Sequence, residues 1–400
     1  MEYQPSEEIL DKYADVLINF ALNNCTGIKK GDIVLLQVPE CAKPFLISLR
    51  RKVLKAGGHA IIQYLPDEMA KGYYELAEEH QIGFFPDKYL KGLVDQIDHS
   101  VFVIAETDKH ELSEIDPKKI MVRGETYKPY KKWRDDKEAS GKFTWTLGLY
   151  GTEAMAKEAN MSLEEYWNEI INACYLDEEN PVEKWKEITS EVERVKEKLN
   201  DLEIKSLRVK SENVDLIVGI GKNRNWMGGS GRNIPSFEVF ISPDKRVTSG
   251  HIKFNQPLYR YGNLIKDVFL RFENGKVVES SASKGEKLLK EMISVEGADY
   301  IGEFSLTDSR LSRITKFMGE TLFDENMGGE FGNTHVALGS AYKDSYPGDP
   351  SSVSDEEWKE MGYNDSSVHT DIISTENREV TATLSDGSEI VIYRDGKFVI

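Results

Sequence analysis

The sequence predicts two domains, an α/β N-terminal domain built on a doubly wound sheet and a mainly β (α+β) C-terminal domain. The chain has 400 residues, which is longer than one hydrophobic core usually spans. Its first half alternates helix-like and strand-like segments, the pattern of a sheet wound on both faces. Its second half changes to short strands separated by turn signals. The predicted domains are therefore residues 1–203 and 204–400.

The first half contains apolar runs typical of buried parallel strands, separated by helical patterns. Residues 6–24 have apolar side chains at helical spacing, with Ser6 as a suitable N-cap, and a second helix is predicted for residues 42–56. The predicted strands are Asp32–Val38, Ala60–Leu65, Ser100–Ala105 and Lys119–Val122. No GxGxxG follows the first strand and no GxxxxGK[ST] occurs, so the sheet has no nucleotide-binding signature.

Two more helices are predicted before the domain boundary. Ser162 and Glu165 form a capping box for a helix that runs to about Leu176. From Val182 onward, apolar residues recur at spacings of three and four, which predicts one amphipathic helix that ends near residues 200–205.

The second half shows the signals of hairpins. Strands are predicted at Leu207–Lys210, Asp215–Ile220, Phe237–Ile241, His251–Phe254 and Lys397–Ile400. The pairs Asn274-Gly275, Asp386-Gly387 and Asp395-Gly396 are typical of two-residue hairpin turns. One helix is expected at residues 285–295.

Composition excludes several classes of function. With 51 Lys+Arg against 69 Asp+Glu, the formal net charge is −18, which argues against nucleic-acid binding and against docking on anionic membranes. No apolar run approaches the roughly 20 residues of a membrane span. The first residues lack the features of a signal peptide, so a cytoplasmic location is expected. Three widely spaced cysteines form neither a disulfide framework nor a thiolate metal site.

Acidic and histidine side chains gather in unusual contexts within the second half. Glu238 and Glu303 each lie in an apolar, strand-like run, and His369 and Asp371 form a His-x-Asp pair between apolar residues. A carboxylate in an apolar strand costs several kcal/mol unless it is paired or binds a metal. Residues 321–342 add Asp324, Glu325, Glu330, His335 and Tyr342.

These residue types suit a borderline divalent ion. Carboxylates and imidazoles without thiolates favour Zn²⁺, Co²⁺ or Mn²⁺. Five or six ligands exceed what one tetrahedral zinc needs, so the count indicates two ions, the arrangement that some hydrolases, aminopeptidases among them, use to activate water. Taken one at a time, each segment also fits an ordinary salt bridge, turn or core position.

Several motifs in order closely resemble the M29 family of metallo-aminopeptidases over nearly the whole chain. They are the opening helix and strand, the segment Ser162–Trp167, Trp226–Ser230, the N-x-P-x-x-E-V-F segment from Asn233, the I-G-E segment from Ile301, TLFDEN from Thr321, H-x-A-L-G-x-A-Y from His335, and H-x-D from His369. The resemblance implies that Glu238, Glu303, His335, His369 and Asp371 bind two metal ions, with Glu303 possible as the bridging ligand. It also implies that Tyr342 stabilises the oxyanion.

The remaining catalytic carboxylate has two candidates. The text of the TLFDEN motif selects Glu325, whereas the five-residue offset to His335 that many relatives share selects Glu330. Either residue would transfer protons as a general acid and base. The segment between Asn326 and His335 is longer here than in many relatives, so the two criteria select different residues. Both Glu325 and Glu330 remain candidates.

The expected function is a metal-dependent aminopeptidase that hydrolyses the N-terminal residue from peptides with a free N-terminus. The N-terminal domain is expected to restrict access to the site. By resemblance the protein is a homodimer whose site faces an enclosed cavity. The first alternative is another dinuclear metal hydrolase, such as a phosphoesterase, for which Lys222, Arg224 and Arg232 would bind phosphate. The second is a non-catalytic binding protein with two domains.

Overall fold

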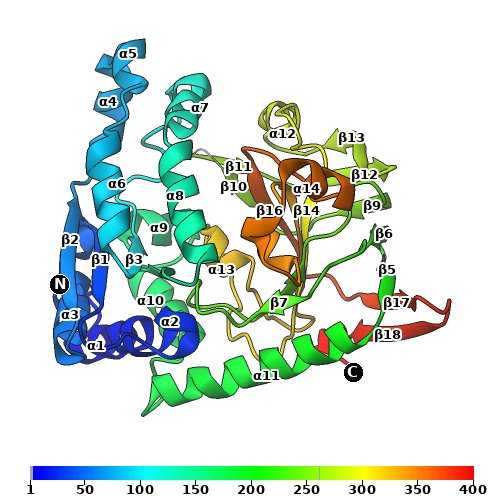
Figure 1. The fold of residues 1–400 in the computed structure, drawn as a ribbon, viewed down its shortest axis with the longest axis horizontal. Coiled ribbons are helices and arrows are strands. Elements are labelled where there is room, and N and C mark those ends of the chain that lie inside the picture. Colours follow the sequence, from blue (N-terminus) through cyan, green and yellow to red (C-terminus); the bar gives the residue numbers. More distant parts are fainter. Residues whose placement is uncertain (1–2, 261) are drawn as a thin grey trace. The chain divides into compact units, whose positions relative to one another are not determined.

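The computed structural model describes residues 3–260 and 262–400. The chain divides into two compact units (Figure 1), the first ending at Glu187 and including Ser230–Pro235, and the second comprising Ile188–Gly229 and Ser236–Ile400. The division falls within the helix α11 (Pro181–Asp201), whereas the sequence analysis put the domain boundary after it.

The first unit is built on a four-stranded parallel sheet in the order β2-β1-β3-β4. The strands are β1 (Ile33–Pro39), β2 (His59–Leu65), β3 (His99–Ile104) and β4 (Thr144–Leu149). From β1 the chain passes to β2 on one side and then returns to β3 on the other side of β1. Because such crossovers are right-handed, connections that run in opposite directions along the sheet place their helices on opposite faces. This arrangement confirms the predicted doubly wound sheet.

Helices precede, connect and follow these strands (Figure 1). They are α1 (Glu7–Val16), a π-helical turn (Leu17–Ala21), α2 (Leu22–Cys25), α3 (Lys43–Lys55), α4 (Ala70–Leu76), α5 (Glu79–Ile82), α6 (Asp87–Gln96), α7 (Pro117–Thr126), α8 (Lys128–Ala139), α9 (Glu153–Glu158), α10 (Leu163–Ala173) and the first part of α11. The predicted N-cap is confirmed, because Ser6 Oγ accepts from the Ile9 N–H. The capping box of Ser162 and Glu165 is also present.

In the sheet of the first unit, one predicted strand is wrong and one strand was missed. Residues 119–122 lie inside α7, which Asp116 caps by accepting from the Lys118 N–H and which Pro117 begins. An Asp-Pro pair at a helix start outweighs a run of three apolar residues, which by itself does not distinguish a strand from a helix. The fourth strand is β4 instead.

The segment Ser230–Pro235 belongs to the first unit because it extends the parallel sheet beside β4. The Leu147 N–H donates to the Arg232 carbonyl over 2.7 Å, and the Ile234 N–H donates to the Leu147 carbonyl over 3.1 Å. Arg232 also forms an ion pair with Glu138 at 2.9 Å. A single domain boundary therefore cannot describe this chain.

The second unit contains an eight-stranded sheet in the order β13-β12-β9-β6-β5-β17-β18-β19, a five-stranded sheet in the order β16-β15-β14-β8-β7, and the pair β10-β11, all antiparallel. The strands are β5 (Ile204–Lys210), β6 (Val214–Gly219), β7 (Met227–Gly228), β8 (Glu238–Ile241), β9 (Ser249–Lys253), β10 (Leu258–Arg260), β11 (Asn263–Ile265), β12 (Phe269–Glu273), β13 (Lys276–Ser281), β14 (Ile301–Thr307), β15 (Asn333–Gly339), β16 (His369–Ser374), β17 (Glu379–Leu384), β18 (Glu389–Arg394) and β19 (Lys397–Phe398).

Few helices accompany these strands, as the sequence predicted. They are the end of α11, α12 (Glu286–Ile293), α13 (Thr321–Asp324) and α14 (Asp355–Met361). The Asn274-Gly275 pair joins β12 to β13 with φ of 51° and 83°, the left-handed pair that a type I′ turn requires. In the described part of the chain, no helix is both long and apolar enough to cross a membrane.

Candidate metal centre

One face of the five-stranded sheet brings the candidate ligands together. In the antiparallel register, Ser305 lies opposite His335, Thr307 lies opposite Glu238, and Ala337 lies opposite Asp371. Paired residues share a face and side chains alternate along each strand. The period of two therefore directs the candidate ligands of β8, β14, β15 and β16 to the same side.

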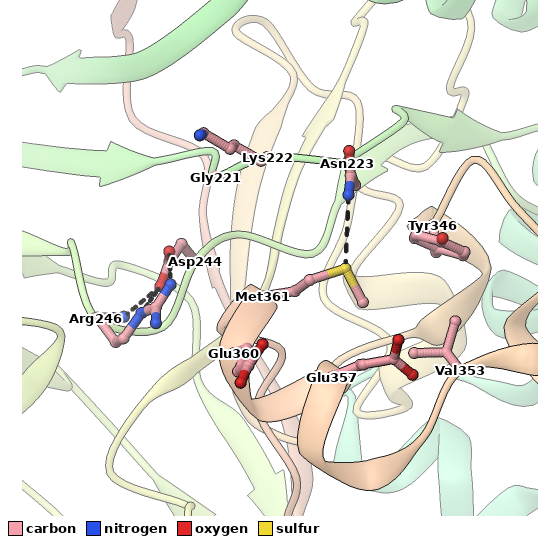
Figure 2. Close-up of a pocket in the computed structure, with 10 residues that line it drawn as sticks. All are labelled: Gly221, Lys222, Asn223, Asp244, Arg246, Tyr346, Val353, Glu357, Glu360 and Met361. Carbon is pink, nitrogen blue, oxygen red and sulfur yellow. Dashed lines mark hydrogen bonds and ion pairs between the residues drawn. The ribbon is translucent and has the colours of Figure 1, made fainter.

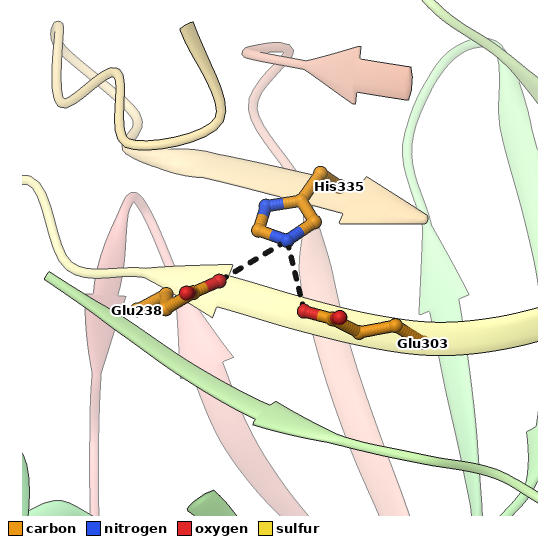
Figure 3. A group of neighbouring side chains, drawn as sticks. All are labelled: Glu238, Glu303 and His335. Carbon is orange, nitrogen blue, oxygen red and sulfur yellow. Dashed lines mark hydrogen bonds and ion pairs between the residues drawn. The ribbon is translucent and has the colours of Figure 1, made fainter. Parts of the chain in front are cut away.

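His335 lies between two carboxylates (Figure 3). Its Nε2 is 3.1 Å from Glu238 Oε2 and 3.2 Å from Glu303 Oε1. His335 is 1% exposed and Glu303 is 3% exposed, so the three side chains converge in the interior. Their donor atoms lie within 4.8 Å of one another, close enough to hold one cation.

A second group shares Glu303 with the first. His369 Nε2 is 3.5 Å from Glu303 Oε2 and 3.5 Å from Asp371 Oδ1, and these three residues also have donor atoms within 4.8 Å of one another. Each oxygen of Glu303 thus faces a different imidazole. Asp371 Oδ1 also lies 4.0 Å from His335 Nε2, which joins the groups into one cluster.

Backbone carbonyls hold both imidazoles in one orientation. His335 Nδ1 lies 3.2 Å from the Glu325 carbonyl, and His369 Nδ1 lies 2.8 Å from the Ser340 carbonyl. A carbonyl only accepts, so each ring donates from Nδ1 and turns Nε2 toward the carboxylates. Histidines that bind metals commonly have this second contact.

Steric crowding explains why the residue before Glu303 is a glycine. A Cβ at Gly302 would lie 2.3 Å from the Gly339 carbonyl oxygen and 2.3 Å from that of Ser340. The strand register shifts here, between Ile301 and Glu303. Only glycine lets β14 approach β15 this closely, and the shift sets the direction of Glu303.

The structure separates the two candidates for the remaining carboxylate. Glu325 directly follows α13 and is 8% exposed. Burial and the carboxylates of Asp371 and Glu238 raise its pKa well above the usual value. Glu330 is exposed, and its side chain is not part of either ligand group. Folding therefore brings Glu325, and not Glu330, to the cluster.

Asn326 anchors the segment that carries Glu325. The Phe237 N–H, next to Glu238, donates to Asn326 Oδ1 over 2.7 Å, and Asn326 Nδ2 donates to the Leu322 carbonyl over 3.2 Å. The same amide group lies 3.5 Å from Glu325 Oε1. The DEN segment is thus tied to the start of β8.

Tyr342 lies at the edge of the cluster. Its ring centroid is 4.9 Å from that of His369 and 5.7 Å from that of Phe240. The residue as a whole is 41% exposed, but burial of the hydroxyl end and the nearby carboxylates, with Glu303 first among them, raise its pKa well above the usual value. A raised pKa favours the protonated phenol, which has a hydrogen to donate.

The charges of the cluster favour cations. Burial raises the pKa of Glu238. Burial also opposes ionisation of Glu303, but hydrogen bonds from His335 and His369 outweigh it and hold its pKa below the usual value. For Asp371 the nearby histidines and Arg260 outweigh burial and lower the pKa to about 2. Four acids against two imidazoles form a donor set that fits divalent cations.

Sequence reasoning missed three polar residues around this cluster. Ser305 donates to Glu238, Ser242 contacts the backbone of Tyr342, and Arg260 adds positive charge near Asp371. Ser305 lies two residues after Glu303 in an otherwise apolar strand, which is a weak signal of its own. Ser242 and Arg260 have no such signal in the sequence.

A pocket elsewhere in the second unit is lined by none of the candidate metal ligands and by neither Glu325 nor Glu330. Its lining includes Lys222, Asp244, Arg246, Glu357 and Glu360 (Figure 2). Arg246 and Asp244 form an ion pair inside it at 2.6 Å. The charged groups of this pocket are therefore separate from the metal centre.

The sequence profile of the family described as thermophilic metalloprotease (M29) matches residues 6–398. Aminopeptidase AmpS of Bacillus subtilis (strain 168) is 28% identical over 97% of this chain and 98% of its own. Aminopeptidase T of Thermus thermophilus is 28% identical over 98% of each chain. The solved structure of wild-type AmpT from Thermus thermophilus matches the fold with a TM-score of 0.85 at 24% identity, over 98% of this chain and 100% of that one.

The match of the family profile over nearly the whole chain identifies the class of the protein as a metal-dependent peptide hydrolase. The chain belongs to the M29 family of metalloproteases. This confirms the family expected from the motifs, and the match to the AmpT structure confirms the fold class.

Proposed function

We propose that the protein is a metal-dependent aminopeptidase that releases the N-terminal residue of peptides. The observation that carries the proposal is the pair of ligand groups that share Glu303. The relatives that match over nearly their whole length are named aminopeptidases. A shared carboxylate between two cation sites is the arrangement that two-metal hydrolases use.

The donor set would hold two divalent ions, of which Zn²⁺, Co²⁺ and Mn²⁺ are the candidates. Glu238, Glu303 and His335 would hold one ion, and Glu303, His369 and Asp371 would hold the other, with Glu303 common to both groups. Paired divalent ions, when bound, supply Lewis-acid polarisation of a carbonyl and a lower pKa for water. The fixed imidazoles keep both Nε2 atoms directed at these positions.

Two further side chains have roles in this proposal. Glu325 accepts a proton from the attacking water and passes it to the leaving amine. Tyr342 keeps its phenolic hydrogen and donates it to the oxyanion that develops on the scissile carbonyl. Both side chains are electrostatically linked to the candidate ligands Glu238 and Asp371. The acidic surroundings also suit the positively charged α-amino group of a peptide.

The alternative of a phosphoesterase has less support. Arg224 donates to the carbonyls of Ser242 and Met361 and lies over the ring of Tyr363. Arg232 pairs with Glu138, and Lys222 lines the separate pocket. Arg224 and Arg232 are thus engaged with other groups, and Lys222 lies in a pocket without the candidate metal ligands. A purely structural cluster is also unfavourable, since four buried acids need compensation.

The test measures hydrolysis of aminoacyl-p-nitroanilides by the full chain. We expect activity that a chelator abolishes and that Co²⁺, Zn²⁺ or Mn²⁺ restores. Glu303→Gln should lose most of the activity, because it removes the ligand shared by both groups. Chelator-insensitive activity of a protein without divalent metal would contradict the proposal, and a fully active Glu303→Gln variant would remove Glu303 from the site.

Homodimer formation and a cytoplasmic location remain predictions. Light scattering coupled to size-exclusion chromatography measures the mass against the 45.5 kDa of one chain. A mass near twice this value is expected.

A further inference from the structure

The face of β14 that carries Glu303 also carries a buried serine without a role in the proposed reaction. Ser305 is 0% exposed and lies directly opposite His335 in the register. Its hydroxyl donates to Glu238 Oε2 over 3.1 Å. A hydroxyl in a strand interior needs such a partner, and a bond to a carboxylate is stronger than one between neutral groups.

Thr307, two residues further along the same face, provides an internal comparison. It lies opposite Glu238 and is also 0% exposed. Among the residues that the structure describes, however, its Oγ1 has no hydrogen-bond partner. A buried hydroxyl on this face therefore does not bond to Glu238 by default, and the contact of Ser305 is specific to its position.

The contact from Ser305 is the one that a bound cation would leave in place at Glu238. Its second polar neighbour is His335 Nε2 at 3.1 Å, and that nitrogen is itself a candidate ligand. When His335 turns its lone pair to a cation, it no longer donates to Glu238. Both contacts are made to the same oxygen, Oε2, so the Ser305 hydroxyl can then still hold Oε2 and leave Oε1 free.

The second ligand group has different support. His369 is held through Nδ1 by the Ser340 carbonyl, and Asp371 contacts the ring of His369. No hydrogen bond of Ser305 to His369 or Asp371 occurs in the described structure, where its hydroxyl bonds to Glu238. Loss of the serine hydroxyl should thus act on one group and leave the other unchanged.

We propose that Ser305 is a positioning residue that orients Glu238 and thereby strengthens divalent-cation binding at the Glu238/Glu303/His335 group alone. This inference rests on the proposed function, because it requires the cluster to bind two cations. Groups that orient metal ligands in this way typically account for about 10- to 100-fold in metal affinity.

The experiment is a titration of Co²⁺ into the metal-free full chain, followed by calorimetry and by the visible absorption of the bound ion. The variants are Ser305→Ala and Thr307→Val, which each remove one buried hydroxyl from the same face of β14. Glu238→Gln and the double variant Ser305→Ala/Glu238→Gln complete the set.

We expect Ser305→Ala to weaken one of two binding steps by about tenfold or more, with a changed spectrum for that ion only. Thr307→Val should bind both ions like the wild type, and Ser305→Ala should have no further effect in the Glu238→Gln background. Equal affinities for Ser305→Ala and wild type would overturn the inference, as would an equal loss at both steps. A wild-type protein that binds no Co²⁺, Zn²⁺ or Mn²⁺ would instead overturn the proposed function itself.

Discussion

The Ser242 hydroxyl forms hydrogen bonds with both the N–H and the carbonyl of Tyr342. The Tyr342 N–H donates to Ser242 Oγ over 2.9 Å, and the Ser242 hydroxyl donates to the Tyr342 carbonyl over 3.1 Å. Ser242 is 0% exposed and directly follows β8, the strand that carries Glu238. The contact therefore links the position of the candidate oxyanion donor to a strand of the metal centre.

We predict that Ser242→Ala lowers kcat through Tyr342. Tyr342→Phe should lower kcat by about 10²- to 10³-fold, as expected for the loss of an oxyanion donor. Ser242→Ala should lower it by roughly fivefold, since a hydrogen bond contributes about 1 kcal/mol. Steady-state kinetics on an aminoacyl-p-nitroanilide provide the measurement. The double variant should be no slower than Tyr342→Phe, and additive losses would show that Ser242 acts by another route.

Glu325 and Glu330 form a matched pair for a second prediction. Glu325→Gln should lower kcat by at least about 10²-fold, the usual contribution of a general acid or base, whereas Glu330→Gln should stay near wild type. The reason is their placement, buried at the cluster for Glu325 and exposed for Glu330. Kinetics of both variants with saturating metal test this. Inactive Glu330→Gln beside active Glu325→Gln would reverse the assignment.

The third prediction concerns the pH dependence of stability in the first unit. Asp32 Oδ2 accepts from the Lys29 N–H over 2.6 Å and lies 2.9 Å from His99 Nε2. Burial opposes ionisation of Asp32, but these hydrogen bonds outweigh it and hold its pKa below the usual 3.8. A lowered folded-state pKa contributes stability above the unfolded-state pKa, and this stability is lost as the pH falls through the folded-state pKa.

Asp32→Asn should therefore reduce the free energy of unfolding at pH 7 by roughly 1 kcal/mol. The difference from wild type should shrink as the pH falls through 3.8, where the carboxyl of the unfolded chain is half protonated, toward the lower pKa of the folded state. Scanning calorimetry of both proteins from pH 7 to pH 3 measures this trend. A difference that stays constant or grows toward low pH would contradict the assigned cause.

Local patterns were sufficient for much of the fold. Apolar runs located β1, β2 and β3 to within one or two residues, and Asn-Gly and Asp-Gly pairs located three hairpins of the second unit. These features depend on neighbouring residues alone. The prediction was wrong at residues 119–122, where a short apolar run competed with the helix-starting pair Asp116-Pro117.

The candidate ligands could also be selected from the sequence, because ionisable side chains in apolar strands are rare. Glu238, Glu303, His335, His369 and Asp371 were chosen on that basis and on their motifs, and folding brings all five together. Period-two alternation explains why His369 and Asp371 reach the same cluster.

Tertiary structure alone decided the rest. Glu325 and Glu330 are five residues apart in one segment, and only the packing of that segment against β8 through Asn326 separates a buried acid from an exposed one. The return of Ser230–Pro235 to the first unit and the contacts of Ser305 and Ser242 likewise join residues far apart in the chain. Sequence determined which residues can bind a cation, since that follows from side-chain chemistry. Which of them share a site, and what orients them, depends on strand register and long-range hydrogen bonds that no local pattern encodes.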